Sequence, residues 1–514
     1  MLRGLIVVNG RMLVANGLQR VSCFFYCIQP NNPGIQLLNL YFCAVRRKNK
    51  NIVLEKVLVE DYAAEGRSLA RVDGKVIFIE RVVPGDVVDV KVFKNKKDWA
   101  EGWPLKFHSL SADRVQPFCS HFGVCGGCQW QMLPYEKQLL YKQRQVMDNL
   151  QRIGKTPLPE SMPIIGADET TQYRNKLEYT FGNRRFLLPN ELSDPDISSE
   201  ENVAGFHAPG IFDKVVDIDT CYLQAEPSNA LRIAVKIFAK ENNWEFYDIR
   251  GHHGFLRTMQ LRICSTGEVM VNIVFGRKDE ANQKKLMDHL LKQFPSITTL
   301  LYTINTKMND SMNDLEPVIF QGNGYVTEKL ESFYFRIGPK SFFQTNTRQA
   351  EKLYRVARDF AELSGKETIY DLYCGTGSIG IFLSPGAKKI IGVDLIAAAI
   401  EDAGQNAALN HLSNAEFYAG DVIDVCNDEF FKAHGFPDVI VTDPPRAGMH
   451  EKLVKKILDV AAPVVVYVSC NPATQGRDLN LLGEKYEVTR IQPLDMFPHT
   501  HHIENVVQLK LKDL

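Results

Sequence analysis

The chain has 514 residues, with 60 lysines and arginines against 61 aspartates and glutamates, and a formal net charge of −1. This length allows about three domains, and the balanced charge means that any binding of nucleic acid must depend on local basic patches. Eleven cysteines in so long a chain do not make a disulfide scaffold, and no apolar run reaches the roughly eighteen residues of a membrane span, so we expect a cytoplasmic monomer.

Residues 1–44 show neither hydrophobic periodicity nor the pattern of a targeting signal. They carry Cys23, Cys27 and Cys43 outside any motif. Regular sequence patterns begin only near residue 48. We therefore expect this extension to be unstructured or to precede the true start of the protein, with Val45 encoded by a GTG start codon that is read as methionine.

Short strands joined by tight turns are predicted over residues 48–110. Residues 74–79 and 86–92 alternate apolar and polar side chains, and Asp73-Gly74 and Pro84-Gly85 are turn pairs. These features predict a small OB-like β-barrel. Cations for phosphates and rings for base stacking are interleaved within it, at Lys91, Phe93, Lys94, Lys96, Lys97 and Trp99. Such a charge run also suits a solvated face, but the segment resembles a TRAM domain, a module found on RNA-modifying enzymes.

Four cysteines predict a metal site in an α+β central domain over residues 111–340. Cys119, Cys125 and Cys128 lie close together with two glycines between the last two, and Cys221 follows much later in the chain. Four thiolates hold either tetrahedral zinc or a four-iron, four-sulfur (4Fe-4S) cluster. Zinc sites usually show two closely spaced pairs, so one triplet with a distant fourth ligand favours the cluster. Four unrelated buried cysteines are the alternative, chiefly for Cys221.

Strands and helices alternate over residues 341–514, the order typical of a parallel, doubly wound α/β sheet. Residues 438–442 and 464–468 are predicted strands, and residues 396–410 and 451–461 are predicted helices. Ligands of such sheets bind at the carboxyl ends of the strands. The polar side chains at these ends are therefore candidate site residues: Asp371, Tyr373, Asp394, Asp443 and Cys470.

The glycine-rich residues 375–380 suit either a nicotinamide dinucleotide or S-adenosylmethionine. Glycines allow a tight turn and close approach to a ligand, and Asp394 is placed to accept both ribose hydroxyls of either cofactor. An anionic Asp371 in this loop would repel a pyrophosphate and favour the cationic methionine end of S-adenosylmethionine. Together with Asp-Pro-Pro at residues 443–445, it favours S-adenosylmethionine. A purely structural glycine turn is the remaining alternative.

Five segments are similar, in sequence and in order, to motifs of the RNA uracil-5 methyltransferases. They are residues 341–346 (Ser-Phe-Phe-Gln-Thr-Asn), 371–377, 443–448 (Asp-Pro-Pro-Arg-Ala-Gly), 469–474 (Ser-Cys-Asn-Pro-Ala-Thr) and 502–505 (His-Ile-Glu-Asn). The chain thus resembles this family, which implies a class I methyltransferase domain. The resemblance implies Cys470 as the nucleophile, Glu504 as the general base, and S-adenosylmethionine contacts from Gln344, Tyr373, Asp394 and Asp443.

These residue types suit the chemistry that the resemblance implies. Carbon 5 of uracil is a poor nucleophile, so a thiolate must first add to carbon 6 and move electron density onto carbon 5. After methyl transfer, a carboxylate removes the carbon-5 proton before the thiol is eliminated. Taken alone, Cys470 could be a small buried hydrophobe and Glu504 a solvated strand residue. No lysine or arginine adjoins Cys470 before Arg477 to lower the pKa of its thiol.

Arg446 helps to identify the base that is modified. RNA cytosine-5 methyltransferases have a similar architecture but carry a cysteine after the two prolines, and the Pro-Cys nucleophile of DNA cytosine-5 enzymes does not occur in this chain. The barrel and the cysteine set resemble those of bacterial 23S rRNA uracil-5 methyltransferases, which carry a 4Fe-4S cluster. We expect 23S rRNA as substrate, with the target uracil flipped from its stack. Transfer RNA methylation and an inactive, redox-responsive RNA-binding protein are the alternatives.

Overall fold

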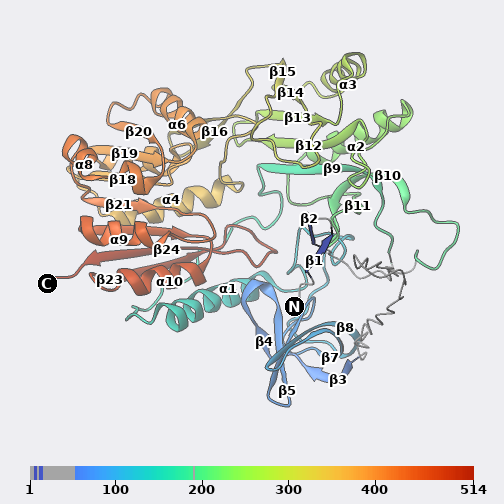
Figure 1. The fold of residues 1–514 in the computed structure, drawn as a ribbon, viewed down its shortest axis with the longest axis horizontal. Coiled ribbons are helices and arrows are strands. Elements are labelled where there is room, and N and C mark those ends of the chain that lie inside the picture. The colour runs from blue at the N-terminus through green and yellow to red at the C-terminus, as the bar shows by residue number, and fades with distance from the viewer. Residues whose placement is uncertain (1–4, 9–10, 15–51, 189–190, 514) are drawn as a thin grey trace, which may run out of the picture. The chain divides into compact units, whose positions relative to one another are not determined.

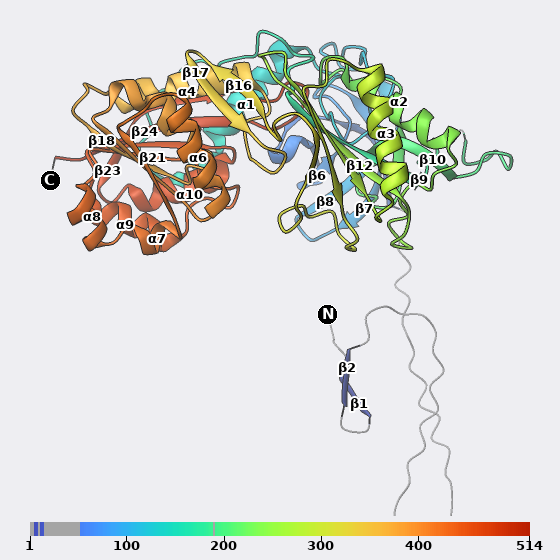
Figure 2. The same cartoon turned by 90° about the horizontal axis from the view of Figure 1, so that it is seen from above.

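The computed structural model describes residues 5–8, 11–14, 52–188 and 191–513. The chain divides into two compact units, Met1–Asn51 and Ile52–Leu514. In the first unit, β1 (Leu5–Val8) pairs with antiparallel β2 (Arg11–Val14), as Figure 2 shows. The rest of the predicted unstructured or misassigned segment, residues 1–44, lies outside the described residues.

The second unit begins with the predicted small barrel. Its six-stranded sheet has the order β3-β7-β8-β6-β5-β4 (Figure 1). The two-residue turn between β5 and β6 is Asp73-Gly74, and both residues have positive φ, of 50° and 76°, as a type I′ hairpin turn requires. Buried valines and isoleucines fill the interior. The strands are β3 (Ile52–Leu58), β4 (Asp61–Tyr62), β5 (Ser68–Val72), β6 (Lys75–Ile79), β7 (Val87–Asn95) and β8 (Trp99–Ser109).

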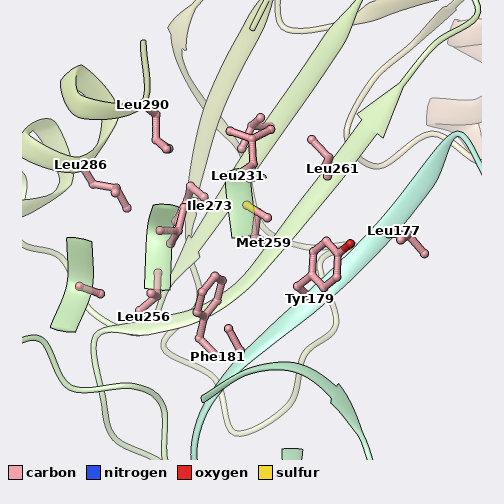
Figure 3. Close-up of a cluster of buried hydrophobic side chains, with 14 of the residues drawn as sticks. Leu177, Tyr179, Phe181, Leu231, Leu256, Met259, Leu261, Ile273, Leu286 and Leu290 are labelled. Atoms are coloured by element: carbon pink, nitrogen blue, oxygen red, sulfur yellow. The ribbon is translucent and has the colours of Figure 1, made fainter. Parts of the chain in front are cut away.

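Helix α1 (Tyr135–Asn149) packs on the carboxyl-terminal region, because its buried Val146 belongs to the hydrophobic core of that region. The central region contains a seven-stranded sheet in the order β11-β10-β9-β12-β13-β14-β15. Strand β9 illustrates how the sheet gains one buried face. Its alternate residues Leu177, Tyr179 and Phe181 are apolar and buried, and the residues between the first two and the last two are more exposed. Figure 3 shows these side chains meeting residues of β12 and of the covering helices. The elements are β9 (Lys176–Arg184), β10 (Glu200–His207), β11 (Val215–Asp217), α2 (Ser228–Glu241), β12 (Leu256–Ile263), β13 (Val269–Phe275), α3 (Glu280–Gln293), β14 (Thr299–Ile304) and β15 (Val318–Gln321).

The carboxyl-terminal region is the predicted doubly wound α/β fold. After a hairpin of β16 (Val326–Leu330) and β17 (Phe333–Ile337), its sheet has the order β20-β19-β18-β21-β22-β24-β23 (Figure 1). The first five strands are parallel, whereas β24 runs antiparallel to both of its neighbours. The predicted helices at residues 396–410 and 451–461 are confirmed as α6 (Ala397–Leu409) and α9 (Glu451–Val460).

The remaining elements of this region complete the alternation of strands and helices. They are α4 (Thr347–Ala361), β18 (Thr368–Leu372), α5 (Ser378–Leu383), β19 (Lys389–Asp394), β20 (Ala415–Ala419), α7 (Val422–Val425), α8 (Asp428–His434), β21 (Val439–Thr442), β22 (Val464–Ser469), α10 (Pro472–Leu482), β23 (Tyr486–Leu494) and β24 (Glu504–Leu511). None of the helices in the described ranges combines the length and the apolar character that a bilayer crossing requires.

Candidate active site and a cysteine-lined cavity

The pairing of β22 with β24 brings the predicted nucleophile and base together. Cys470 directly follows β22, and Glu504 is the first residue of β24. Ser469 is the register partner of Asn505. Because β24 is antiparallel, its first residue lies at the same edge of the sheet as the last residue of β22. Asp443, which follows β21, lies at this edge as well.

Arg446 is a neighbour of the Cys470 thiol that the sequence did not reveal. The thiol is half-buried, and burial, followed by the charges of Glu504 and Asp443, raises its pKa to about 11. The positive charge of Arg446 opposes this shift. Arg477, the nearest cation along the sequence, instead pairs with Asp478 at 2.7 Å. The thiolate is therefore stabilised by a residue from the Asp-Pro-Pro-Arg segment.

Glu504 is a buried carboxyl group beside other acids. Its side chain belongs to a residue that is only 5% exposed. Burial, reinforced by the charge of Asp443, raises the pKa of Glu504 well above its usual range, and Arg446 opposes that shift. Burial also raises the pKa of Asp443 to about 7. The raised pKa makes the Glu504 carboxylate a stronger base than that of an exposed glutamate.

Asp371 differs from the expectation that it is an anion in the glycine loop. It lies within β18, is 1% exposed, and its Oδ2 accepts a hydrogen bond from the Gly380 amide at 2.8 Å. Burial, with the charges of Asp443 and Asp394, raises its pKa to about 7. Among the described residues, its Oδ1 has no hydrogen-bond partner. One carboxylate oxygen of Asp371 therefore holds the Gly380 end of the loop, and the other, Oδ1, is free to accept a hydrogen bond.

The glycine loop itself is shaped for close approach of a ligand. Tyr373 and Gly375 both have positive φ, of 65° and 54°, and no atom lies within 4 Å of where a Gly375 side chain would begin. Asp394 Oδ2 accepts from the Gly375 amide at 2.9 Å, and Oδ1 accepts from the Ile396 amide at 2.9 Å. Two backbone amides thus fix the Asp394 carboxylate at the end of β19.

Gln344 lies in a loop that the central region anchors. The residue is 9% exposed, and its carbonyl oxygen accepts a hydrogen bond from Asn175 Nδ2 at 2.9 Å. Nearby, the Asn346 side chain caps α4 by accepting from the Gln349 amide at 3.2 Å. The Asn346 side chain also donates to the Met496 carbonyl oxygen at 2.9 Å. The structure therefore holds Gln344 in place between two regions that are far apart in the sequence.

The four predicted cysteine ligands line one cavity of about 310 Å³. Burial raises the pKa of Cys125 to about 11 and that of Cys128 to about 12, and it also raises the pKa of Cys221. No three or more His, Cys, Asp or Glu side chains in the described part of the chain are arranged to hold a metal ion. Arg174 and His502 also line this cavity.

The outer face of the barrel carries an aromatic surface that only partly matches the prediction. Phe93 is 47% exposed and Trp103 is 37% exposed, and their rings stack with centroids 5.2 Å apart. The Arg81 guanidinium lies 5.4 Å from the Trp103 ring centroid. Trp99, which the sequence suggested for stacking, instead packs edge-on against Phe78. Trp103 was missed because it falls outside the lysine run.

Comparison with known proteins agrees with this geometry. Residues 255–512 match the tRNA (uracil-5-)-methyltransferase family, and residues 55–105 match the TRAM domain. An RNA methyltransferase of Bacteroides thetaiotaomicron is 52% identical over 88% of this chain and all of its own length. One of Porphyromonas gingivalis is 48% identical over 88% of this chain and 98% of its own length.

Among solved structures, this chain is similar to the Pyrococcus abyssi tRNA (uracil-54, C5)-methyltransferase in complex with S-adenosyl-L-homocysteine. The two superpose with a TM-score of 0.69 and 28% identity, over 88% of this chain and all of that one. The fold is thus a TRAM β-barrel joined to a class I methyltransferase domain. The chain belongs to the RNA uracil-5 methyltransferase family and is an S-adenosylmethionine-dependent RNA (uracil-5-)-methyltransferase.

Proposed function

We propose that this enzyme methylates carbon 5 of a uracil in 23S rRNA through a covalent adduct between Cys470 and carbon 6. The observation that carries the chemistry is the placement of Cys470 and Glu504 on adjoining strands, at the edge where the glycine loop lies. The resemblance of the cysteine set to that of bacterial 23S rRNA uracil-5 methyltransferases supports rRNA. The similarity to a tRNA (uracil-54, C5)-methyltransferase supports tRNA as the second candidate.

Each residue has one task in this reaction. The Cys470 sulfur forms a bond to carbon 6, and the electron pair of the 5,6 double bond moves onto carbon 5 and oxygen 4. Arg446 stabilises the thiolate before attack. After carbon 5 has gained the methyl group, Glu504 removes its proton, the double bond re-forms and the carbon–sulfur bond breaks. The raised pKa of Glu504 suits a base that must take up this proton.

The cofactor residues are proposed to be Gln344, Tyr373, Asp394 and Asp443. S-adenosylmethionine, when bound, supplies an electrophilic methyl group on a sulfonium cation. The open space at Gly375 lets a ligand approach the backbone of the loop closely. Asp371 Oδ1, which has no partner among the described residues, can accept a hydrogen bond from a donor group of that ligand. Leu395 and Ile396 follow Asp394 and are 65% and 57% exposed, so they offer an apolar cover for an adenine ring.

The affinity for S-adenosylmethionine is expected to depend on pH. Asp371 and Asp443 both have pKa values raised to about 7, so below pH 7 they bind protons that a cationic ligand must displace. Affinity should therefore rise up to about tenfold per pH unit for each proton displaced, and level off above pH 7. Isothermal titration calorimetry measures this directly. S-adenosylhomocysteine, which keeps the α-ammonium group but lacks the sulfonium charge, is the control for the contribution of that charge. An affinity for S-adenosylmethionine that does not change with pH would contradict the prediction.

The cysteine cavity is proposed to hold a 4Fe-4S cluster bound by Cys119, Cys125, Cys128 and Cys221. Its volume of about 310 Å³ far exceeds the roughly 10–15 Å³ that one water molecule needs by the same measure, so the cavity admits a group of several atoms. All four cysteines are free thiols. Burial raises the pKa of three of these thiols, so their thiolates are unfavourable unless a cation balances the charge. The iron ions of a cluster would supply that positive charge.

Protein purified without air should be brown and contain about four irons per chain. Cys221→Ser should lose most of this iron because one ligand of the set is removed. Cys264→Ser is the matched control, since Cys264 is also a buried cysteine but does not line the cavity. Iron analysis and visible absorbance are the measurements. Stoichiometric zinc without iron in anaerobic protein would refute the cluster.

The stacked pair Phe93 and Trp103 is proposed as a contact surface for RNA bases. Trp103→Ala should weaken RNA binding by about 1–3 kcal/mol, the usual contribution of one stacked base. Fluorescence anisotropy with a labelled rRNA fragment measures this effect. Leu105→Ala is the control, because Leu105 is on the same strand and 55% exposed but carries no ring. Equal weakening by both variants would indicate general apolar contact instead of stacking.

The substrate is tested by transfer of labelled methyl from S-adenosylmethionine to unmodified 23S rRNA and, separately, to unmodified tRNA. Mass spectrometry of the product then locates 5-methyluridine. Transfer to 23S rRNA alone supports the proposal, and transfer to tRNA alone replaces it with the second candidate. Absence of transfer to any RNA, with the cofactor bound, would instead indicate an inactive RNA-binding protein.

A further inference from the structure

Two side chains, His502 and Arg446, connect the cysteine cavity to the nucleophile. His502 lines the cavity together with the four cysteines. Its Nδ1 lies 2.9 Å from Nη2 of Arg446. Arg446 in turn lies beside Cys470, because its carbonyl oxygen accepts a hydrogen bond from Asn471 Nδ2 at 3.0 Å, and it opposes the rise in the pKa of the Cys470 thiol. Two sites that the sequence assigned to different domains are thus separated by one hydrogen-bonded pair.

The hydrogen bond between these side chains has only one possible direction. A guanidinium carries donors and no acceptor, so His502 Nδ1 must accept from Arg446. The proton of the neutral ring then lies on Nε2. The imidazole therefore acts on the guanidinium through a single acceptor atom, whose position depends on how the ring is held.

Arg446 has a fixed backbone but an exposed side chain. Its carbonyl oxygen accepts hydrogen bonds from Asn471 Nδ2 at 3.0 Å and from Thr474 Oγ1 at 3.2 Å. Asn471 directly follows Cys470 and Thr474 lies four residues after it, so these bonds keep the Arg446 backbone close to the nucleophile. The residue is nevertheless exposed. The orientation of its guanidinium therefore depends on the His502 ring.

We propose that His502 is a positioning residue that couples the cysteine cavity to Cys470. A group that fills the cavity fixes the imidazole, the imidazole holds the Arg446 guanidinium, and the guanidinium favours the reactive thiolate. Emptying the cavity frees the ring and releases Arg446, which makes Cys470 less reactive. This inference rests on the proposed roles of Cys470 and of the cluster.

The experiment follows alkylation of Cys470 by iodoacetamide as a function of pH, read by mass spectrometry of the peptide that contains it. Anaerobically purified protein is compared with protein whose iron has been removed by a chelator. An opposite charge nearby shifts a pKa by about 1–3 units, so iron removal should slow alkylation near neutral pH by roughly tenfold or more. His502→Ala should be equally slow with and without iron. His502→Asn, whose amide oxygen replaces the Nδ1 acceptor, should behave as the wild type does.

Several outcomes would overturn the coupling. The first is that Cys470 of the wild-type protein is alkylated at the same rate with and without iron. A difference that persists in His502→Ala is the second, because it would show that the charge of the cluster acts through space. Binding of S-adenosylmethionine verifies that each sample is folded. If iron removal abolishes S-adenosylmethionine binding, the two variants are compared in iron-containing protein only. Equal alkylation rates of Cys470 in His502→Ala and His502→Asn would then overturn the proposal.

The proposed function is judged by a separate readout, methyl transfer to RNA. Loss of transfer with an intact alkylation difference would count against the substrate and not against the coupling. An alkylation rate insensitive to His502, in a protein that methylates RNA, would leave the function standing and remove the coupling.

Discussion

Replacing Glu504 by glutamine is expected to trap the enzyme on its RNA. The glutamine amide cannot remove the carbon-5 proton, whereas Cys470 can still add to carbon 6 and the methyl group can still be transferred. A methylated covalent protein–RNA adduct should therefore accumulate, and turnover should fall by roughly 10²–10⁴-fold, the usual contribution of a general base. The adduct is detected as a slowly migrating band on a denaturing gel and by mass spectrometry of the peptide that contains Cys470.

Cys470→Ala is the matched variant, because it should form no adduct and transfer no methyl group. RNA containing 5-fluorouracil tests the nucleophile directly, since carbon-5 fluorine cannot leave as a proton and the wild-type enzyme should stay attached. Cys374→Ala should still form this adduct, because Cys374 is buried in the cofactor loop and its pKa is raised well above the usual value by burial. Adduct formation by Cys470→Ala, or wild-type turnover by Glu504→Gln, would show that other residues carry the chemistry.

The sequence allowed prediction of the features that depend on strand ends and on local turns. The parallel order of the sheet places the residues after β18, β19, β21 and β22 at one edge, and this order follows from the alternation of apolar strands and helices. The Asp73-Gly74 hairpin turn was equally predictable, because its positive φ values favour this residue pair.

The interactions that tune the site were not predictable, because they depend on distant segments. Arg446 lies near Cys470 because β21 pairs with β22, and its side-chain partner His502 comes from the loop before β24. The raised pKa of Asp371 depends on burial, which its position ahead of the three glycines of the loop does not reveal. Trp103 points outward because of the bulges in the β7–β8 pair. These bulges shift the alternation of side chains between the two faces of the sheet.

A buried ion pair fixes the loop before β24, which carries His502 and leads into Glu504. Lys142 of α1 and Asp495 are both fully buried, with Nζ 2.6 Å from Oδ1. Lys142 Nζ also donates to the Phe497 carbonyl oxygen at 3.1 Å, and Tyr135 donates to Asp495 Oδ2 at 2.9 Å. The pair thus joins the helix that follows the cysteine triplet to the loop that enters the active site.

Breaking this pair is expected to have the largest effect on stability. Lys142→Met leaves Asp495 as an uncompensated buried charge, which costs about 3–5 kcal/mol. The double variant Lys142→Met/Asp495→Asn removes both charges, so it should be less destabilised than the sum of the two single variants. The midpoint of urea denaturation, followed by tryptophan fluorescence, measures these differences, because the ring centroid of buried Trp130 lies 5.9 Å from Lys142 Nζ.

Lys137→Met is the control, since it makes the same substitution on α1 but breaks an exposed pair with Asp113, and it should leave the midpoint unchanged. Equal midpoints for Lys142→Met and Lys137→Met, or additive single effects, would show that the loop is held by its backbone hydrogen bonds and not by the ion pair.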